Sequence, residues 1–144
     1  MRQLHVMDTG APENFLNVLG ESIAICGGGD ATKPFEIHLQ KGDTGGGPPP
    51  HYHPWDEAFC VLEGKVKVTV DGEERIVSQG MVIHIPANTV HAYENLSDGA
   101  TLLGVVSDPK GGEMFRQIDR EVKVLPEDLP KVISIGQQYG VEFV

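Results

Sequence analysis

The 144-residue chain lacks most features of secreted, membrane and nucleic-acid-binding proteins. It has only two cysteines, Cys26 and Cys60, no apolar run of membrane-spanning length, and too few apolar residues near Met1 for a signal peptide. Eleven basic and 21 acidic residues give a net charge of −10 without a basic stripe, which disfavours binding to nucleic acid or anionic membranes. We therefore expect a cytoplasmic protein with two free, structural thiols.

Hydrophobic residues make up 40% of the chain, a value typical of a globular domain with a single core. Short apolar or alternating segments are separated by glycine, asparagine and Asp71-Gly72, which is the signal of a two-residue hairpin. This pattern predicts an all-β barrel or sandwich. We predict strands at 15–26 (with a break at Gly20), 35–40, 58–63, 65–70, 73–78, 81–85, 91–95 and 101–106.

Two histidines on these strands lie outside the motifs discussed below. The segment 35–40 alternates strictly, which predicts that Phe35, Ile37 and Leu39 face inward and that His38 is a surface histidine on the polar face. The orientation of His84 stays open, although a histidine in the barrel wall is favoured over a partner of a metal ligand.

The glycine- and proline-rich stretch from Gly42 to Pro50 lies between two predicted strands of one barrel. We interpret it as a loop and not as a linker between domains. Its three prolines can stiffen the entry to the next strand, because proline fixes φ and offers no N–H. A flexible surface loop is the other interpretation that remains open.

The run His51-Tyr52-His53-Pro54-Trp55-Asp56-Glu57 has three possible metal ligands at odd positions of one extended segment. Side chains on a strand alternate between faces, so His51, His53 and Glu57 are expected to point the same way. Glu57 would share that side with Phe59 and Val61, where an unpaired carboxylate is costly and a cation compensates it. Two imidazoles beside it suit a borderline divalent metal. Solvated turn histidines and an edge carboxylate are the alternative from this run alone.

Two segments resemble the paired motifs of the cupin family. Gly45, His51-x-His53, Glu57 and Gly64 have the spacing of the first motif, and Gly80, Pro86, His91 and Asn95 have that of the second. Asn88 stands where the family usually has glycine, but asparagine tolerates left-handed backbone angles better than most residues. The resemblance implies a double-stranded β-helix, or jelly-roll barrel, that binds a divalent metal through His51, His53, Glu57 and His91.

The resemblance also implies a single cupin domain over residues 1–144, with a barrel core at about 15–108 and an extension at 109–144. In the extension, residues 112–116 can form a helical turn, and residues 129–140 read as a short helix that Pro130 opens and Gly140 stops. Cupins form dimers, so a homodimer is expected. Whether the extension covers a barrel mouth or packs on a partner subunit stays open.

Runs such as Pro-Pro-Pro-His-x-His resemble the quercetin dioxygenase-like cupins. This resemblance implies one divalent transition metal ion per chain (Fe, Mn, Ni, Co, Cu or Zn) and a dioxygenase acting on a small enolic or aromatic, flavonol-like molecule. Glu57 would also be the catalytic base, and Phe59 and Tyr93 would line the substrate pocket. A sugar or sugar-phosphate isomerase and a non-catalytic module that binds metal or a small molecule are the alternatives. The isomerase is disfavoured because few basic residues lie near the motifs.

Overall fold

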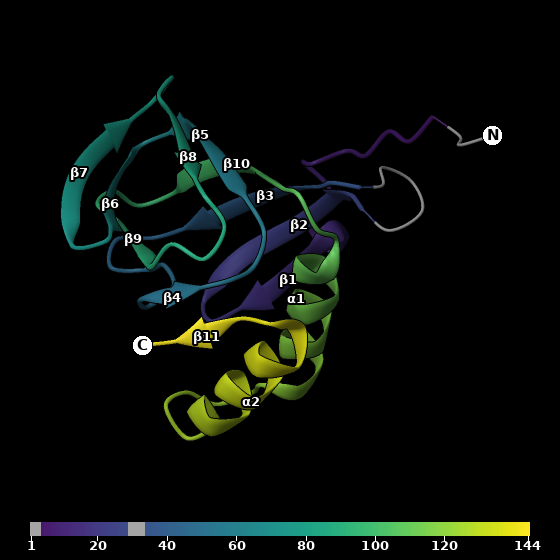
Figure 1. Cartoon of the computed structure of the whole chain (residues 1–144). Helices are drawn as coiled ribbons and strands as arrows, with labels where there is room; N and C mark the ends of the chain where they lie inside the picture. The colour runs from purple at the N-terminus through teal and green to yellow at the C-terminus, as the bar shows by residue number, and fades with distance from the viewer. Residues whose placement is uncertain (1–3, 29–33) are drawn as a thin grey trace.

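The computed structural model describes residues 4–28 and 34–144 and contains two β-sheets that face each other, with two helices beside them (Figure 1). The six-stranded sheet has the order β1-β2-β3-β10-β5-β8, and the five-stranded sheet has the order β11-β4-β9-β6-β7. The elements are the 3₁₀ turn η1 (Pro12–Asn14), β1 (Phe15–Val18), β2 (Glu21–Gly27), β3 (Glu36–Gly42), β4 (His51–Tyr52), β5 (Glu57–Glu63), β6 (Lys65–Val70), β7 (Glu73–Ser78), β8 (Val82–Ile85), β9 (His91–Asn95), β10 (Ala100–Val106), α1 (Lys110–Glu121), α2 (Leu129–Tyr139) and β11 (Glu142–Phe143). This arrangement confirms the predicted all-β barrel with a helical extension.

Three turns form where the sequence predicts them. Asp71 (φ 48°) and Gly72 (φ 83°) make the two-residue connection between β6 and β7, in which Val70 pairs with Glu73. Gly20 separates β1 from β2. Asn88 adopts the left-handed conformation (φ 62°), and its N–H donates to the carbonyl of His53 at 2.7 Å. The asparagine that replaces the usual glycine therefore keeps the turn and ties it to the ligand segment.

Strand β3 corrects one prediction about which side chains face inward. Three polar residues face the barrel interior and are at most 4% exposed: Glu36, His38 and Gln40. His38 lies opposite Ile25 of β2 and Gly104 of β10, and Gln40 lies opposite Ile23 and Leu102.

The alternating apolar residues Ile37 and Leu39 of the same strand lie on the outer face, beside Val105 and Leu103 of β10. Phe35, which directly precedes the strand, is 40% exposed. Hydrophobic alternation therefore located the two faces correctly but did not show which of them is inside.

The two helices cover the inner side of β1 and β2, at one end of the six-stranded sheet (Figure 1). Their buried residues Met114, Ile118 and Ile135 pack with Ile23 and Ile25. Helix α2 starts and stops close to the predicted residues, with Gly140 as a left-handed C-cap (φ 88°). None of the described helices has the length and apolar character needed to cross a membrane.

Helix α1 is much longer than the predicted turn at 112–116. Its first turn contains Gly111 and Gly112, which have low intrinsic helix propensity. Both pack against the carboxylate of Glu36, and a Cβ added at Gly112 would collide with it. Tertiary packing therefore requires glycine at position 112, where local propensity argues against a helix.

The loop before β4 is bonded to the end of β9. The Gly45 N–H donates to the Asn95 carbonyl at 2.9 Å, and the Asn95 N–H donates to the Gly46 carbonyl at 2.8 Å. Gly47 has φ 127° and lies so close to the Tyr93 carbonyl that a Cβ would collide with it. These contacts favour the interpretation of a fixed entry to β4 over that of a flexible loop.

Two alanine substitutions in this loop distinguish the cost of backbone strain from the cost of a steric collision with Tyr93. Gly45→Ala introduces only a left-handed alanine (φ 84°) with open space around its Cβ, so we expect a loss of about 1 kcal/mol in the free energy of unfolding. Gly47→Ala adds the collision with Tyr93, so we expect a loss of about 2–4 kcal/mol. Urea denaturation of the two variants measures both values. Equal losses would show that the close approach at Gly47 contributes nothing.

Candidate metal centre

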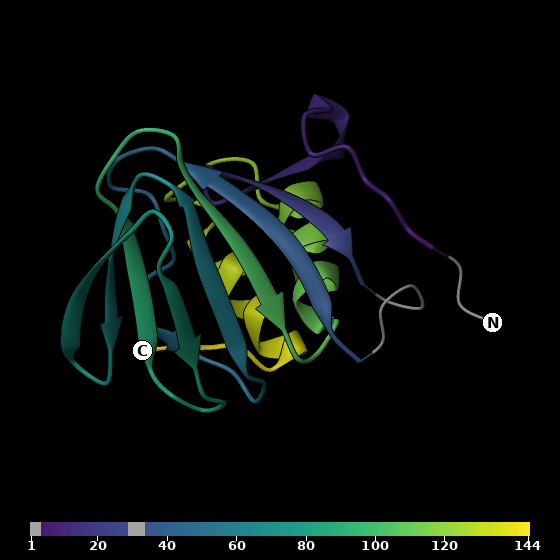
Figure 2. The ribbon, with the colours of Figure 1, turned by 90° about the horizontal axis from the view of Figure 1, so that it is seen from above.

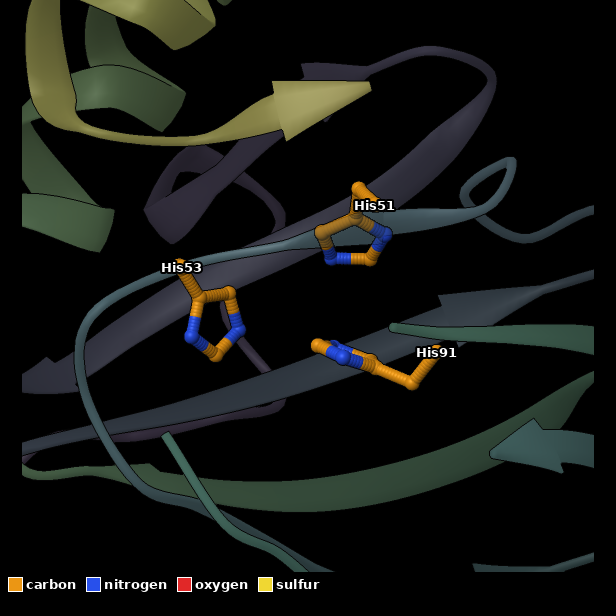
Figure 3. A group of neighbouring side chains, drawn as sticks. All are labelled: His51, His53 and His91. Atoms are coloured by element: carbon orange, nitrogen blue, oxygen red, sulfur yellow. The ribbon is translucent and has the colours of Figure 1, made fainter. Parts of the chain in front are cut away.

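Three histidines meet between the two sheets, as Figure 3 shows. His51 lies in β4 directly opposite His91 in β9, and His53 follows β4. Glu57 is the first residue of β5, in the other sheet. The structure thus brings together all four residues of the predicted ligand set.

The route by which these residues converge differs from the predicted one. His51, His53 and Glu57 do not lie on one extended strand, because β4 ends at Tyr52 and β5 begins only at Glu57. The intervening residues carry the chain from the five-stranded to the six-stranded sheet. Asp56 fixes this crossing, since its Oδ1 accepts the Ala87 N–H at 2.9 Å. The ligands therefore face each other across the barrel and are not aligned along a strand.

Backbone carbonyls orient all three imidazoles in the same manner. A carbonyl oxygen only accepts hydrogen bonds, so the ring nitrogen next to it must be protonated. The Nδ1 atoms make these bonds at 2.9, 2.9 and 2.8 Å, from His51 to Pro49, from His53 to Trp55 and from His91 to Thr89. In the neutral rings, each Nε2 therefore keeps a free lone pair, which is the state required of a metal ligand.

Two of the free nitrogens lie beside the carboxylate of Glu57. Its Oε2 lies 3.2 Å from His53 Nε2 and 3.3 Å from His91 Nε2, and the latter is buried without a hydrogen-bond partner. Lone pairs facing a carboxylate repel it unless a proton or a cation lies between them. Atoms that bind one ion at about 2.1 Å are roughly 3 Å apart, so this spacing suits a shared divalent ion. The possible ligand atoms of the three histidines lie within 4.8 Å of one another.

The electrostatics of the cluster also favour a cation. Burial, together with the neighbouring His91, lowers the pKa of His51 to about 4, which keeps that ring neutral and available as a ligand. Burial alone would raise the pKa of Glu57, but the neighbouring imidazoles of His53 and His91 outweigh it and hold this pKa below its usual range. The carboxylate is therefore ionised at neutral pH.

The cluster opens onto a cavity of about 90 Å³. Phe59 and Tyr93, the two residues predicted to line a substrate pocket, lie in its wall. The Tyr93 hydroxyl is engaged, at 2.8 Å from Glu21 Oε2 and 2.6 Å from Gln40 Oε1. The apolar part of the wall consists of Val18, Leu19, Ile23, Val106, Met114, Phe115, Ile118, Val141 and Phe143.

Sequence reasoning missed three polar residues of this wall, namely Glu21, His38 and Gln40. The alternation of β3 was a signal for His38 and Gln40, but it was assigned to the wrong face. No pattern in the sequence around Glu21 indicates that it is buried in this wall. Its carboxylate is held there by hydrogen bonds from Tyr93 and Asn95, which lie on a distant strand. His84 lies on the outside, is 59% exposed and pairs with Asp56 at 3.1 Å.

Comparison with known proteins identifies the class of protein. The family model described as "Cupin domain" matches residues 35–107, so the chain belongs to the cupin family. More particularly, the matched stretch contains both histidine motifs of one cupin domain. KdgF from Halomonas sp. has the same jelly-roll fold, with a TM-score of 0.65 and 23% identity, covering 74% of this chain and 94% of that one.

Two further relatives bear on chemistry. Quercetin 2,3-dioxygenase of Bacillus subtilis is 40% identical over 57 residues, which are 39% of this chain and 17% of that protein. A cupin-superfamily sugar phosphate isomerase from Silicibacter pomeroyi is 29% identical with a TM-score of 0.54, covering 61% of this chain and 59% of that one. The chain spans between 17% and 60% of the length of the curated relatives it matches.

Metal titration tests the ligand set directly. Trp55 is the only tryptophan, and its ring stacks on His53 with centroids 4.5 Å apart, so a paramagnetic ion at His53 should quench its fluorescence. We expect Ni²⁺ added to metal-free protein to quench this emission with saturation at about one equivalent per chain.

Variants assign the ligands in the same titration. His51→Ala and His91→Ala are each expected to weaken Ni²⁺ binding at least about 100-fold, since each removes a direct ligand. His84→Ala is the matched control and should bind Ni²⁺ normally, because His84 lies on the outer surface. Undiminished binding by either of the first two variants would remove that residue from the ligand set.

Proposed function

We propose that this cupin is a metal-dependent dioxygenase that acts on a small enolic or aromatic, flavonol-like substrate. His51, His53, Glu57 and His91 would hold one divalent transition metal ion. When bound, such an ion supplies Lewis acidity that lowers the pKa of a substrate hydroxyl, and a redox-active ion adds chemistry with dioxygen. The observation that carries the proposal is the convergence of three free imidazole nitrogens and one carboxylate on the wall of a mainly apolar cavity.

Glu57 has two properties that a catalytic base needs. Its carboxylate is ionised and lies in the cavity wall, where it can accept the proton of a substrate hydroxyl. His53 and His91 both contact its Oε2, so its orientation is fixed before a substrate arrives. Glu57 would thus hold the metal and also take the proton.

The remaining wall suits an aromatic ring. Phe59 and Tyr93 pack edge to face, with centroids 5.9 Å apart, and form one side of the cavity. Met114 and Phe115 of α1 and Phe143 of β11 contribute the apolar side toward the helices. The partial match to quercetin 2,3-dioxygenase supports this substrate class.

A sugar or sugar-phosphate isomerase is the second candidate, and the isomerase relative from Silicibacter pomeroyi favours it. A phosphate group needs cationic or N–H partners in its site. Among the described residues that line the cavity there is no lysine or arginine. We therefore place the isomerase below the dioxygenase. A non-catalytic module would use the same site without turnover.

Oxygen consumption distinguishes these candidates. We expect the Fe-, Mn- or Ni-loaded protein to consume oxygen with a flavonol or a related enolic aromatic molecule. Glu57→Gln should lower turnover about 100-fold or more, because it removes the base and weakens the metal site. Glu63→Gln, at the exposed end of the same strand, is the control and should keep full turnover.

Failure of this experiment would be informative. If the protein contains its metal but consumes no oxygen across a broad panel, the dioxygenase proposal is wrong and the binding module is favoured. Isomerisation of a sugar phosphate by the same preparation would favour the second candidate.

We also propose that the chain forms a homodimer through the outer face of the six-stranded sheet. Figure 2 shows the helices on one side of this sheet only. On the other side, Leu62, Val82 and Val105 are 37–69% exposed. Exposed apolar side chains on one face of a sheet favour association through that face. Because the chain carries a net charge of −10, an apolar face allows two copies to approach with the least repulsion.

A charge placed in this face tests the dimer. Val105→Lys puts a lysine in the middle of the sheet, on β10, and we expect it to convert a dimer into a monomer in sedimentation velocity at micromolar concentration. Ile76→Lys is the control, because Ile76 is 58% exposed but belongs to the five-stranded sheet. A monomeric unmodified protein, or an unchanged mass for the Val105 variant, would contradict the proposed interface.

A further inference from the structure

Leu19 has a backbone conformation that leucine rarely adopts. Its φ is 55°, and with Gly20 (φ 86°) it forms the two-residue connection between β1 and β2, in which Val18 pairs with Glu21. Two positive φ values in succession are typical of a type I′ turn, whose first position favours asparagine, aspartate or glycine. A bulky residue at this position requires an explanation, because its Cβ crowds the carbonyl oxygen that follows it.

The second tight hairpin of the chain shows the ordinary choice. Asp71 and Gly72 connect β6 to β7 with nearly the same φ values, 48° and 83°. Aspartate tolerates this conformation better than leucine does. Formation of the turn therefore does not account for the leucine at position 19, and its side chain is the feature to explain.

Neighbouring groups hold the Leu19 turn in place. The Gly20 N–H donates to Asn17 Oδ1 at 3.3 Å, and the Asn17 N–H donates to Asp119 Oδ1 of α1 at 2.8 Å. The Leu19 side chain packs against the buried cluster that contains Val18 and Val141. Strained conformations persist where the surrounding structure fixes them in this way. The fold therefore presents the Leu19 side chain at one defined place.

That place is the border of the cavity beside the metal site. Leu19 is one of the cavity-lining residues, most of which are buried. An opening to solvent has to be bordered by lining residues that are themselves partly exposed. Among the described residues, the half-buried ones in this lining are Leu19, Gly47, Pro48, His51, Phe115 and Phe143. Because His51 is one of them, an ion held by the cluster lies close to the opening.

The size of the cavity gives this border a role in binding. Its volume of about 90 Å³ is small beside the roughly 300–1,000 Å³ of typical ligand sites. A ring that binds the ion beside His51 would fill much of this space, and a further ring attached to it would extend to the opening. The side chains of Leu19, Pro48 and Phe143 make that border largely apolar.

We propose that Leu19 is a specificity-determining residue that covers an aryl substituent of the metal-bound substrate at the opening of the cavity. This inference rests on the proposed function and narrows its substrate class to enolic molecules with an aromatic ring attached beside the metal-binding oxygen atoms. The leucine side chain supplies apolar surface for that ring, which asparagine or aspartate in the same turn would not supply.

Two matched ligands test this role without any turnover. 3-Hydroxychromone and 3-hydroxyflavone share one fused ring system and one metal-binding oxygen pair, and they differ in a single phenyl group. Calorimetric titration into the Zn²⁺-loaded protein gives both affinities. We expect the unmodified protein to prefer 3-hydroxyflavone by about ten-fold, since the phenyl group buries apolar surface.

Substitution of Leu19 should reduce this preference selectively. Leu19→Asn keeps a residue that suits the turn but removes the apolar side chain. We expect it to lower the preference for 3-hydroxyflavone about five-fold, the effect of uncovering about 40 Å² of apolar surface, and to leave the affinity for 3-hydroxychromone within about two-fold. Leu19→Met, which restores an apolar side chain, should retain most of the preference.

Controls separate the side chain from the turn. Gly20→Ala strains the same turn, with open space around the added Cβ, and leaves Leu19 in place. We expect it to lower Tm by about 3 °C or more and to keep the preference. Zinc content shows that each variant has its metal. If Leu19→Asn does not fold, Leu19→Gly replaces it, because glycine also suits a positive φ.

Three results would overturn the role of Leu19: an unchanged preference in Leu19→Asn, an equal loss of preference in Gly20→Ala, or equal affinities of the unmodified protein for the two compounds. Each of them would leave the proposed function intact, since both compounds still bind the metal-loaded protein. Failure of both compounds to bind would contradict the proposed function as well.

Discussion

Electrostatic repulsion at the metal site is the constraint on which the rest of the structure depends. The carboxylate of Glu57 lies beside imidazole nitrogens of His53 and His91 whose lone pairs face it. The Nδ1 bonds to backbone carbonyls leave the rings no other neutral arrangement. The Asp56 contact that holds the crossing, the Asn88 turn bonded to His53, and the direct pairing of His51 with His91 all maintain this geometry. A cation between these groups would remove the repulsion, so folding and metal binding are expected to be thermodynamically linked.

The helical extension turns one side of the barrel into a cavity wall. Strands β1 and β2 lie at one edge of the six-stranded sheet, and Met114, Ile118 and Ile135 of the helices pack over them. The result is a chamber with imidazoles and carboxylates on one side and an apolar lining toward the helices. Such a division suits a ligand that has oxygen atoms at one end and a hydrophobic ring at the other.

The sequence predicted well what depends on short-range chemistry. Asp71-Gly72, Gly140 and Asn88 adopt the expected left-handed conformations, because each lies at a turn or cap that requires a positive φ. The spacing of His51, His53, Glu57 and His91 likewise placed these residues in one cluster. What failed depends on contacts between distant segments. Alternation in β3 could not show which face packs inward, and the glycine at position 112 in the first turn of α1 is explained only by the presence of Glu36.

The pairing of β11 with β4 makes the last residues of the chain neighbours of the metal site. Phe143 lies opposite His51, with ring centroids 6.0 Å apart, and the Val144 N–H donates to the Pro50 carbonyl at 3.1 Å. Without β11, the strand that carries His51 would have an open edge. Order in residues 142–144 and occupancy of the ion site should consequently reinforce each other, since each stabilises the same short strand. A fusion or a protease cut at this edge would therefore lower the affinity for the cation before it affects the rest of the fold.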